Sequence, residues 1–323
     1  MQRRATAAAL ALLSVIGIAS EAWAQAASWP DKPVKLILPY APGGATDLIG
    51  RPWADKLGQV FGQQFVIENR GGAGGMIGTE AAAKSPPDGY TFLLTPAATL
   101  TILPHLRQAP YDAMKSFDPV GRVGDLVSGF VIHPAVGVKT FKEMVDYAKK
   151  NPGKLAYGSA GLGTATQLRV EMLKYRAGID ILHVPYRGSA DALNDLLPNN
   201  IQMMNEINVL PHVKAGKLIL LDINAPQRHP DFPDVPTLTE LGYPDSDVPI
   251  WFFVCAPAGT PKDIVAKLNA RMVELAKTEE MIAKMRAINV VVPPQTPDEI
   301  RAYLAEDSKR NAELIKAANI KIE

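Results

Sequence analysis

Short apolar runs alternate with amphipathic segments of helix length along nearly the whole sequence. Such alternation produces βαβ units, in which helices cover both faces of a parallel sheet, so an α/β fold is predicted. We expect strands at residues 34–39, 65–68, 90–95, 154–157, 181–184, 201–204, 217–223 and 251–256. We expect helices at residues 47–61, 76–84, 141–150, 164–177, 189–197, a segment ending at 215, 261–277, 279–287 and 297–318.

The chain has 323 residues, which is more than one hydrophobic core usually serves, and this length favours two lobes. The apolar stretches 121–133 and 248–256 are candidates for strands that cross between the lobes. One lobe would then be discontinuous, and the segment between the crossings would form the other. We expect lobe 1 to contain residues 25–124 and 250–323, and lobe 2 residues 125–249. A single sheet of nine or ten strands is the alternative.

The N-terminus has the three parts of a secretory signal peptide. Arg3 and Arg4 precede an uncharged run at residues 5–19, and Ala22-Trp23-Ala24 forms a cleavage site. The uncharged run is shorter than the roughly 20 residues that a helix needs to cross a bilayer. We therefore expect residues 1–24 to be removed and the protein to be exported to the periplasm; an uncleaved anchor is the alternative.

Charge and cysteine content exclude several classes of protein. The 34 basic and 33 acidic side chains nearly balance, unlike the basic excess of nucleic-acid-binding proteins. Removing Arg3, Arg4 and Glu21 with the leader leaves equal numbers, so an anion site has to rely on local donors. The single Cys255 excludes a disulfide within the chain, and the histidines show no metal-ligand spacing. We expect no metal and no cofactor.

Three loops follow apolar strands and precede expected helices, and all three are rich in small residues: 38–47, 94–99 and 157–165. Ligands of α/β sheets bind at the carboxyl ends of strands, where these loops lie. A helix N-terminus offers unpaired N–H groups to an anion there, and glycines let the backbone approach it closely. The alternative is that Gly43-Gly44 makes a turn and that Thr46, Asp47, Ser159 or Thr164 only caps a helix.

Motifs along the whole mature chain resemble those of the Bug-type solute-binding proteins of tripartite tricarboxylate transporters. The matching segments, in chain order, are residues 29–34, 39–47, 68–75, 87–91, 111–112, 151–155, 157–161, 183–188, 215–218, 233–237 and 256–261. The resemblance implies a periplasmic binding protein fold of type II, with two lobes joined by two crossover strands. Each lobe would have a mainly parallel sheet flanked by helices.

The resemblance also implies a function and a site. A small organic carboxylate would bind between the lobes, which close on it, and would be delivered to a membrane permease with a large and a small subunit. Tyr186 and Arg187 lie in a motif shared by the family, so a structural role for them stays open. The implied ligand-binding residues are Tyr40, Ala41, Gly43, Gly44, Thr46, Asp47, Thr95, Ala97, Ala98, Ser159, Ala160, Gly163, Thr164, Ala165, Tyr186 and Asn205.

Two departures from the family pattern bear on the ligand. After Gly163 the family often has Ser-Pro-Gly-His, whereas this chain has residues 164–167 as Thr-Ala-Thr-Gln, so Gln167 and Arg169 are candidates for contacting the far end of the ligand. A solvated Arg169 is the alternative. The family commonly has an aromatic residue and then Asp near Met203-Met204-Asn205; without that acid the wall is expected to be apolar and adaptable. This favours an aromatic or otherwise apolar mono- or dicarboxylate.

The leading interpretation is therefore a monomeric periplasmic binding protein and not an enzyme. An exported α/β hydrolase or transferase, using a hydroxyl at one of the three loops, is the first alternative. The second is a ligand-loaded input to a sensor kinase, which the sequence does not distinguish from a transport protein.

Overall fold

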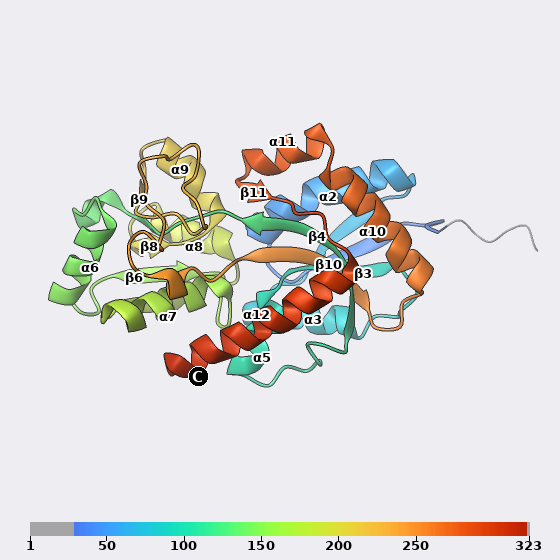
Figure 1. The fold of residues 1–323 in the computed structure, drawn as a ribbon, viewed down its shortest axis with the longest axis horizontal. Coiled ribbons are helices and arrows are strands. Elements are labelled where there is room, and N and C mark those ends of the chain that lie inside the picture. The colour runs from blue at the N-terminus through green and yellow to red at the C-terminus, as the bar shows by residue number, and fades with distance from the viewer. Residues whose placement is uncertain (1–28, 322–323) are drawn as a thin grey trace, which may run out of the picture.

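The protein has two sheets, each covered by helices on both faces (Figure 1). The structure is a computed structural model that describes residues 29–321. The signal peptide expected at residues 1–24 lies outside this range. In Figure 1 the lobe with α6 to α9 lies on the left, and the lobe with α2, α3 and α10 lies on the right.

The first sheet has six strands, and its halves differ in direction. β1 pairs in parallel with β2 and β3, whereas β10 pairs antiparallel with β3 and β4, and β11 pairs antiparallel with β4. The strands, in order across the sheet, are β11 (Val290–Val291), β4 (Phe117–Leu126), β10 (Trp251–Pro257), β3 (Thr91–Pro96), β1 (Val34–Leu38) and β2 (Phe65–Asn69).

The second sheet has five shorter strands and is also mixed. β6 pairs in parallel with β7 and β8, whereas β5 pairs antiparallel with β8 and β9. The strands, in order across the sheet, are β7 (Leu182–Pro185), β6 (Ala156–Ser159), β8 (Met203–Met204), β5 (Val131–Ile132) and β9 (Ile219–Leu220).

The expected two-lobed α/β architecture is confirmed, but the expectation of mainly parallel sheets is corrected. β4 and β10 are neighbours in the sheet but are far apart in the sequence and run in opposite directions. β4 leads the chain out of the first sheet, and β10 brings it back. A strand that leaves and a strand that returns lie antiparallel when they are neighbours. Each crossing therefore introduces antiparallel pairs into a sheet whose remaining strands come from βαβ units.

The helices lie between the strands in nearly the expected order. α6 and α12 begin with capping boxes, Thr140 with Glu143 and Thr296 with Glu299, and α2 ends at Gly62 in the left-handed conformation. The helices are α2 (Ala45–Phe61), α3 (Met76–Ala83), α4 (Ala98–Thr101), α5 (Leu103–Leu106), α6 (Phe141–Lys150), α7 (Ala165–Ala177), α8 (Ser189–Leu196), α9 (Leu210–Lys214), α10 (Lys262–Ala276), α11 (Glu279–Ala287) and α12 (Pro297–Ala317). Single 3₁₀ turns are η1 (Ala73–Gly75), η2 (Pro134–Val136), η3 (Ile207–Val209) and η4 (Pro244–Ser246).

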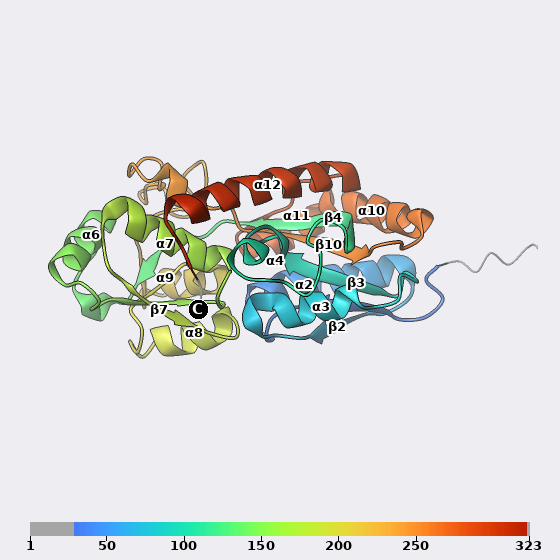
Figure 2. The ribbon, with the colours of Figure 1, turned by 90° about the horizontal axis from the view of Figure 1, so that it is seen from below.

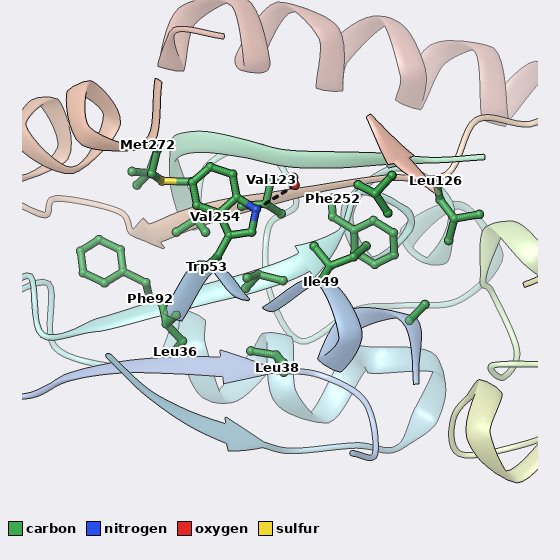
Figure 3. Close-up of a cluster of buried hydrophobic side chains, with 14 of the residues drawn as sticks. Leu36, Leu38, Ile49, Trp53, Phe92, Val123, Leu126, Phe252, Val254 and Met272 are labelled. Carbon is green, nitrogen blue, oxygen red and sulfur yellow. Dashed lines mark hydrogen bonds between the residues drawn. The ribbon is translucent and has the colours of Figure 1, made fainter. Parts of the chain in front are cut away.

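The strands of the first sheet are apolar on both sides because helices cover both faces. Leu36 and Leu38 of β1 pack in the cluster beneath α2 and α10, and Ile37 between them packs on the opposite face with α3 and α12. Figure 3 shows the first of these clusters, in which Trp53 of α2 donates from Nε1 to the carbonyl of Val123 at 2.9 Å. The buried indole N–H thus has the partner that its position requires.

The chain crosses between the lobes twice. It leaves the first sheet after β4 and enters the second at β5, and it returns to the first sheet at β10. α12 then runs along the side of the molecule towards α7 (Figures 1 and 2). The lobe boundaries expected after residues 124 and 249 stay predictions.

Candidate functional site

A cavity lies between the two sheets, at the ends of strands from both lobes. Its wall is built from helix N-termini, strand ends and one crossover strand. The lining residues are Tyr40, Gly44, Ala45, Thr46, Pro96, Ala98, Ala160, Thr164, Ala165, Thr166, Ser189, Glu206, Ile250 and Phe252.

The first part of the wall is the loop between β1 and α2. The buried Tyr40 hydroxyl donates to the carbonyl of Gly74 at 2.9 Å, and burial raises the pKa of Tyr40 above its ordinary value. Behind the loop, the Asp47 carboxylate accepts from the Gly43 N–H at 3.1 Å and from Arg51 at 2.8 Å. Asp47 therefore holds the loop that brings Gly44, Ala45 and Thr46 to the cavity, while itself remaining outside it.

Burial acts to raise the pKa of Asp47, but the hydrogen bonds from Arg51 and Gly43 outweigh it and hold this pKa below its usual value. Asp47 is therefore ionised at neutral pH, and its carboxylate accepts hydrogen bonds from these two donors. Asp47 supports the loop and lies outside the lining of the cavity.

The second part of the wall is the N-terminus of α7. Thr164 caps this helix: its hydroxyl accepts from the Gln167 N–H at 3.3 Å and donates to the carbonyl of Gly161 at 2.8 Å. The Gln167 side chain reaches back from α7 to the loop, where its Oε1 accepts from the Gly163 N–H at 2.7 Å. The Thr164 cap and the Gln167 side chain together fix the loop, so that Ala160, Thr164 and Ala165 line the cavity.

Pro96 and Ala98 form the third part of the wall, between β3 and α4. Thr95 lies behind them, fully buried, and its hydroxyl is 2.9 Å from the Thr99 hydroxyl. Ala97 is held to the crossover strand β10 by its N–H, which donates to the carbonyl of Trp251 at 2.9 Å. The same strand region contributes Ile250 and Phe252, which make this side of the cavity apolar.

Unpaired donors from both lobes lie at this cavity. Within the described chain, the N–H groups of Thr46 at the start of α2 and of Ala165 and Thr166 at the start of α7 have no acceptor. The first N–H groups of a helix lack partners within it, and the helix dipole makes such ends favourable for an anion. The geometry thus offers converging donors without a cationic side chain in the wall.

The structure divides the residues implied by the resemblance into two groups. Those that line the cavity are Tyr40, Gly44, Thr46, Ala98, Ala160, Thr164 and Ala165. Those outside its lining are Ala41, Gly43, Asp47, Thr95, Ala97, Ser159, Gly163, Tyr186 and Asn205. Most of the second group support the first: the Asn205 amide, for example, donates to the carbonyl of Thr166 at 3.0 Å.

Tyr186 and Arg187 are not among the residues that line the cavity. The Tyr186 hydroxyl donates to Asp195 at 2.6 Å, and Arg187 is exposed. Gln167 and Arg169 were the candidates for contacting the far end of the ligand. Gln167 instead supports the loop by accepting from the Gly163 N–H. Arg169 is 1% exposed, which contradicts the alternative of a solvated side chain.

Arg169 links α7 to both crossings between the lobes. Its Nε donates to the carbonyl of Val248 at 2.6 Å, and its Nη1 donates to the Ser128 hydroxyl at 2.9 Å. A third bond goes to Asn224 Oδ1 at 3.0 Å. Burial lowers the pKa of Arg169 from its ordinary value, opposed by Asp247 and other nearby acids. Its role is therefore to hold the crossings.

Glu206 and Ser189 also line the cavity, although no motif pointed to them. Glu206 stands one residue beyond Met203-Met204-Asn205, so the expectation of a wall without an acid is wrong. The signal was present, because Glu206 follows a strand end just as the loops at 38–47 and 157–165 do. Ser189 begins α8, and its hydroxyl accepts from the Ala45 N–H of the other lobe at 3.2 Å.

Ser159 and His183 form a pair that resembles part of a hydrolase site. The Ser159 hydroxyl is 2.7 Å from His183 Nε2, and the Tyr157 ring stacks on the imidazole. Burial lowers the pKa of His183 to about 4, so the ring is neutral at pH 7. Ser159 is fully buried outside the cavity wall, and no carboxylate of residues 29–321 hydrogen-bonds to His183. A hydrolase requires an exposed nucleophile and an oriented base, so this pair supports the loop instead.

Two further findings apply to residues 29–321. No group of three or more His, Cys, Asp or Glu side chains in this range is arranged to hold a metal ion. None of the helices in this range has the length and apolar character that crossing a membrane requires.

The sequence matches the family described as tripartite tricarboxylate transporter family receptor over residues 49–320. Protein BugT of Bordetella pertussis is 34% identical, over 96% of this chain and 98% of its own. The solved structure of the periplasmic binding protein BugD is 33% identical with a TM-score of 0.87, and covers 91% of this chain and 100% of its own. R. palustris Rpa4515 with adipate is 31% identical with the same TM-score, over 91% and 99% of the two chains.

These matches span both lobes and the cavity between them, and they exclude the hydrolase or transferase alternative. The chain belongs to the tripartite tricarboxylate transporter receptor family, whose members are periplasmic solute-binding proteins and not enzymes.

Proposed function

We propose that this protein binds one small organic carboxylate between its lobes and delivers it to the membrane subunits of a tripartite tricarboxylate-type transporter. The observation that carries the proposal is the convergence of unpaired helix N–H groups from α2 in one lobe and α7 in the other on a single cavity. An anion held by both ends stabilises the closed arrangement of the lobes in proportion to its preference for that arrangement.

The relatives support the carboxylate as the ligand class. Rpa4515, which resembles this chain over nearly its full length, was solved with adipate. The family description names a receptor of a tripartite transporter, which supports delivery to membrane subunits. Delivery of this kind takes place in the periplasm, so the proposal includes export and removal of residues 1–24, and action as a monomer.

The lining indicates what the rest of the ligand is like. Ile250, Phe252 and Pro96 provide an apolar side, whereas Thr46, Thr166 and Glu206 are polar residues that line the same space. The preference for an aromatic or wholly apolar carboxylate rested on the absence of an acid here, and Glu206 removes that reason. We therefore propose a short mono- or dicarboxylate with an apolar middle.

A carboxylate panel tests the proposal directly. The protein is unfolded, dialysed to remove bound molecules and refolded, and it is then titrated calorimetrically with adipate, succinate, benzoate and citrate. We expect at least one to bind with a stoichiometry of one and to raise the melting temperature, because a ligand that binds only the folded state stabilises it. The corresponding neutral amide is expected not to bind. The proposal is wrong if none of the four binds at any pH between 5.5 and 8.5.

A further inference from the structure

A buried acid lies in the wall of a cavity whose other polar groups suit an anion. Glu206 is 3% exposed and lines the cavity between the lobes. Its backbone neighbours are fixed on both sides: Asn205 donates to the carbonyl of Thr166 at 3.0 Å, and Asn208 donates to the carbonyl of Ser189 at 2.9 Å. Two hydrogen bonds to the N-termini of α7 and α8 thus hold the segment that carries Glu206 at the cavity.

No cation of the described chain neutralises this carboxyl by direct contact. Among residues 29–321, no Lys or Arg nitrogen lies within 4.0 Å of Glu206. The Thr166 hydroxyl of α7 lies close enough to this carboxyl to lower its pKa. An ionised carboxylate in this position would be buried with little compensation, which is costly in a protein interior.

The ionisable groups that act on Glu206 come from two neighbouring elements. Arg169 of α7 attracts it, but that guanidinium also lies near Asp247 and Asp222 and donates its hydrogen bonds elsewhere. Tyr40 at the end of β1 is a neutral phenol at neutral pH. Burial, opposed by Arg169 and Thr166, raises the pKa of Glu206 to about 7.

A bound anion changes this balance in one direction. A ligand carboxylate in the same cavity puts a second negative charge close to Glu206, which is itself buried. Two carboxyl groups that share a site cannot both ionise without a large penalty, so one of them takes up a proton. The converging helix N-termini favour charge on the ligand, which leaves the proton on Glu206.

We propose that Glu206 acts in ligand binding as a neutral carboxylic acid that donates a hydrogen bond to the bound carboxylate, so that each carboxylate is captured together with one proton. This inference rests on the proposed function of the site. It assigns Glu206 as a ligand-contacting residue and adds proton uptake to the binding reaction.

The opposite role for Glu206 predicts the opposite pH dependence. An ionised Glu206 would accept a hydrogen bond from a ligand hydroxyl or ammonium group, and binding would tighten as the pH rises. If Glu206 binds the ligand as the neutral acid, then above pH 7 the free protein has to take up a proton before it binds. Binding therefore weakens as the pH rises. The sign of the pH dependence therefore separates the two.

Calorimetric titration of the full mature chain measures both the affinity and the protons. The probe is whichever of adipate, succinate, benzoate and citrate binds most tightly, in two buffers of different ionisation enthalpy. For the wild type we expect the dissociation constant to rise about thirtyfold between about pH 6 and pH 8.5. We expect uptake of roughly one proton per ligand at about pH 8 and roughly a tenth of a proton at about pH 6.

Two variants locate the effect. Glu206→Gln keeps the shape and a donor but cannot ionise, so we expect tight binding with no pH dependence and no proton uptake. Asp125→Asn is the matched control, because burial also raises the pKa of this acid and it lies on β4 outside the cavity wall. We expect Asp125→Asn to keep the pH dependence of the wild type.

The outcomes distinguish the inference from the function on which it rests. Carboxylate binding by the wild type that is independent of pH, or that tightens as the pH rises, overturns the inference and leaves the proposed function standing. Absence of binding of all four probes to both wild type and Glu206→Gln at every pH overturns the proposed function. If Glu206→Gln does not fold, the proton count of the wild type still decides the matter.

Discussion

Ala165 offers a way to remove a single donor from the cavity without removing a side chain. It is the first residue of α7, it lines the cavity, and its N–H has no acceptor in the described chain. Proline is favoured at the first position of a helix, and Thr164 before it already has the extended conformation that proline requires, with φ −90° and ψ 158°. We expect Ala165→Pro to fold normally and to bind its carboxylate about ten- to a hundredfold more weakly, as measured by calorimetry.

Two further variants control for side effects of this substitution. Glu279→Pro makes the same change at the first residue of α11, after the extended Thr278, and should leave binding unchanged. Ala165→Val adds bulk at the cavity but keeps the N–H. An equal loss of affinity in Ala165→Val would show that bulk, and not the donor, explains the effect.

Which residues of the site could be predicted depended on how local their pattern is. The loops at Gly44 and Thr164 could be recognised because a strand end, small residues and a helix start follow one another in the sequence. Glu206 and Ser189 were harder to recognise. Glu206 also follows a strand end, but β8 has only two residues, and the place of both side chains at the cavity depends on how β8 and α8 lie beside α7. Asp47 shows the converse: it lies in the right segment, but the Gly43 N–H and Arg51 turn its carboxylate away from the cavity.

At the level of elements, length decided what could be predicted. Long strands such as β1 and β10 are apolar on both faces and could be recognised from composition alone. The two-residue strand β11 exists only through its pairing with β4, which no local pattern encodes. β5 lies at the end of the apolar stretch 121–133, but its separation from β4 could not be predicted. No bounds could be predicted for the short helices α4 and α5, since four residues are too few to show a helical period.

The cap of α7 has two roles that a matched pair of variants can separate. Thr164 and Thr140 each accept a hydrogen bond from the N–H three residues on, at 3.3 and 3.2 Å, so losing either hydroxyl should cost about 1 kcal/mol of stability. Only Thr164 also lines the cavity and anchors Gly161. We expect Thr164→Ala to lower both the melting temperature and the carboxylate affinity, the latter about tenfold because the donors shift.

Thr140→Ala should lower the melting temperature by a similar amount and leave the affinity unchanged. The same two measurements on both variants suffice, with Thr164→Ser as the conservative replacement that retains the cap. Equal affinities for Thr164→Ala and Thr140→Ala would confine Thr164 to its structural role.

At the scale of the whole molecule, the two lobes touch across the cavity, which the sequence could not reveal. Ala45 of one lobe donates to Ser189 of the other, and Ala41 lies against Gly188. These contacts join residues about 145 positions apart, so they depend on how the lobes close and not on any segment alone. Two lobes with two crossings could be predicted from the apolar stretches, whereas their closed arrangement required the structure.

Gly74 marks the point where closure leaves no room for a side chain. It has φ +66°, and a Cβ built on it would lie 2.0 Å from the carbonyl oxygen of Leu162 in the other lobe. Gly62 has almost the same backbone, with φ +69°, but its Cβ would meet nothing within 4 Å. Alanine at either position incurs the same left-handed strain, about 1–2 kcal/mol. Only alanine at Gly74 also keeps the lobes apart.

We therefore expect Gly74→Ala and Gly62→Ala to lose similar thermal stability but to differ in ligand binding. Gly62→Ala should bind its carboxylate like the wild type, and its radius of gyration, measured by small-angle X-ray scattering, should fall when the carboxylate is added. Gly74→Ala should bind at least about tenfold more weakly, because the donors of α2 and α7 no longer reach one anion together, and it should not contract. Binding of the carboxylate by Gly74→Ala with wild-type affinity and without contraction would mean that the carboxylate is held by one lobe, and that closure between the lobes is not what binds it.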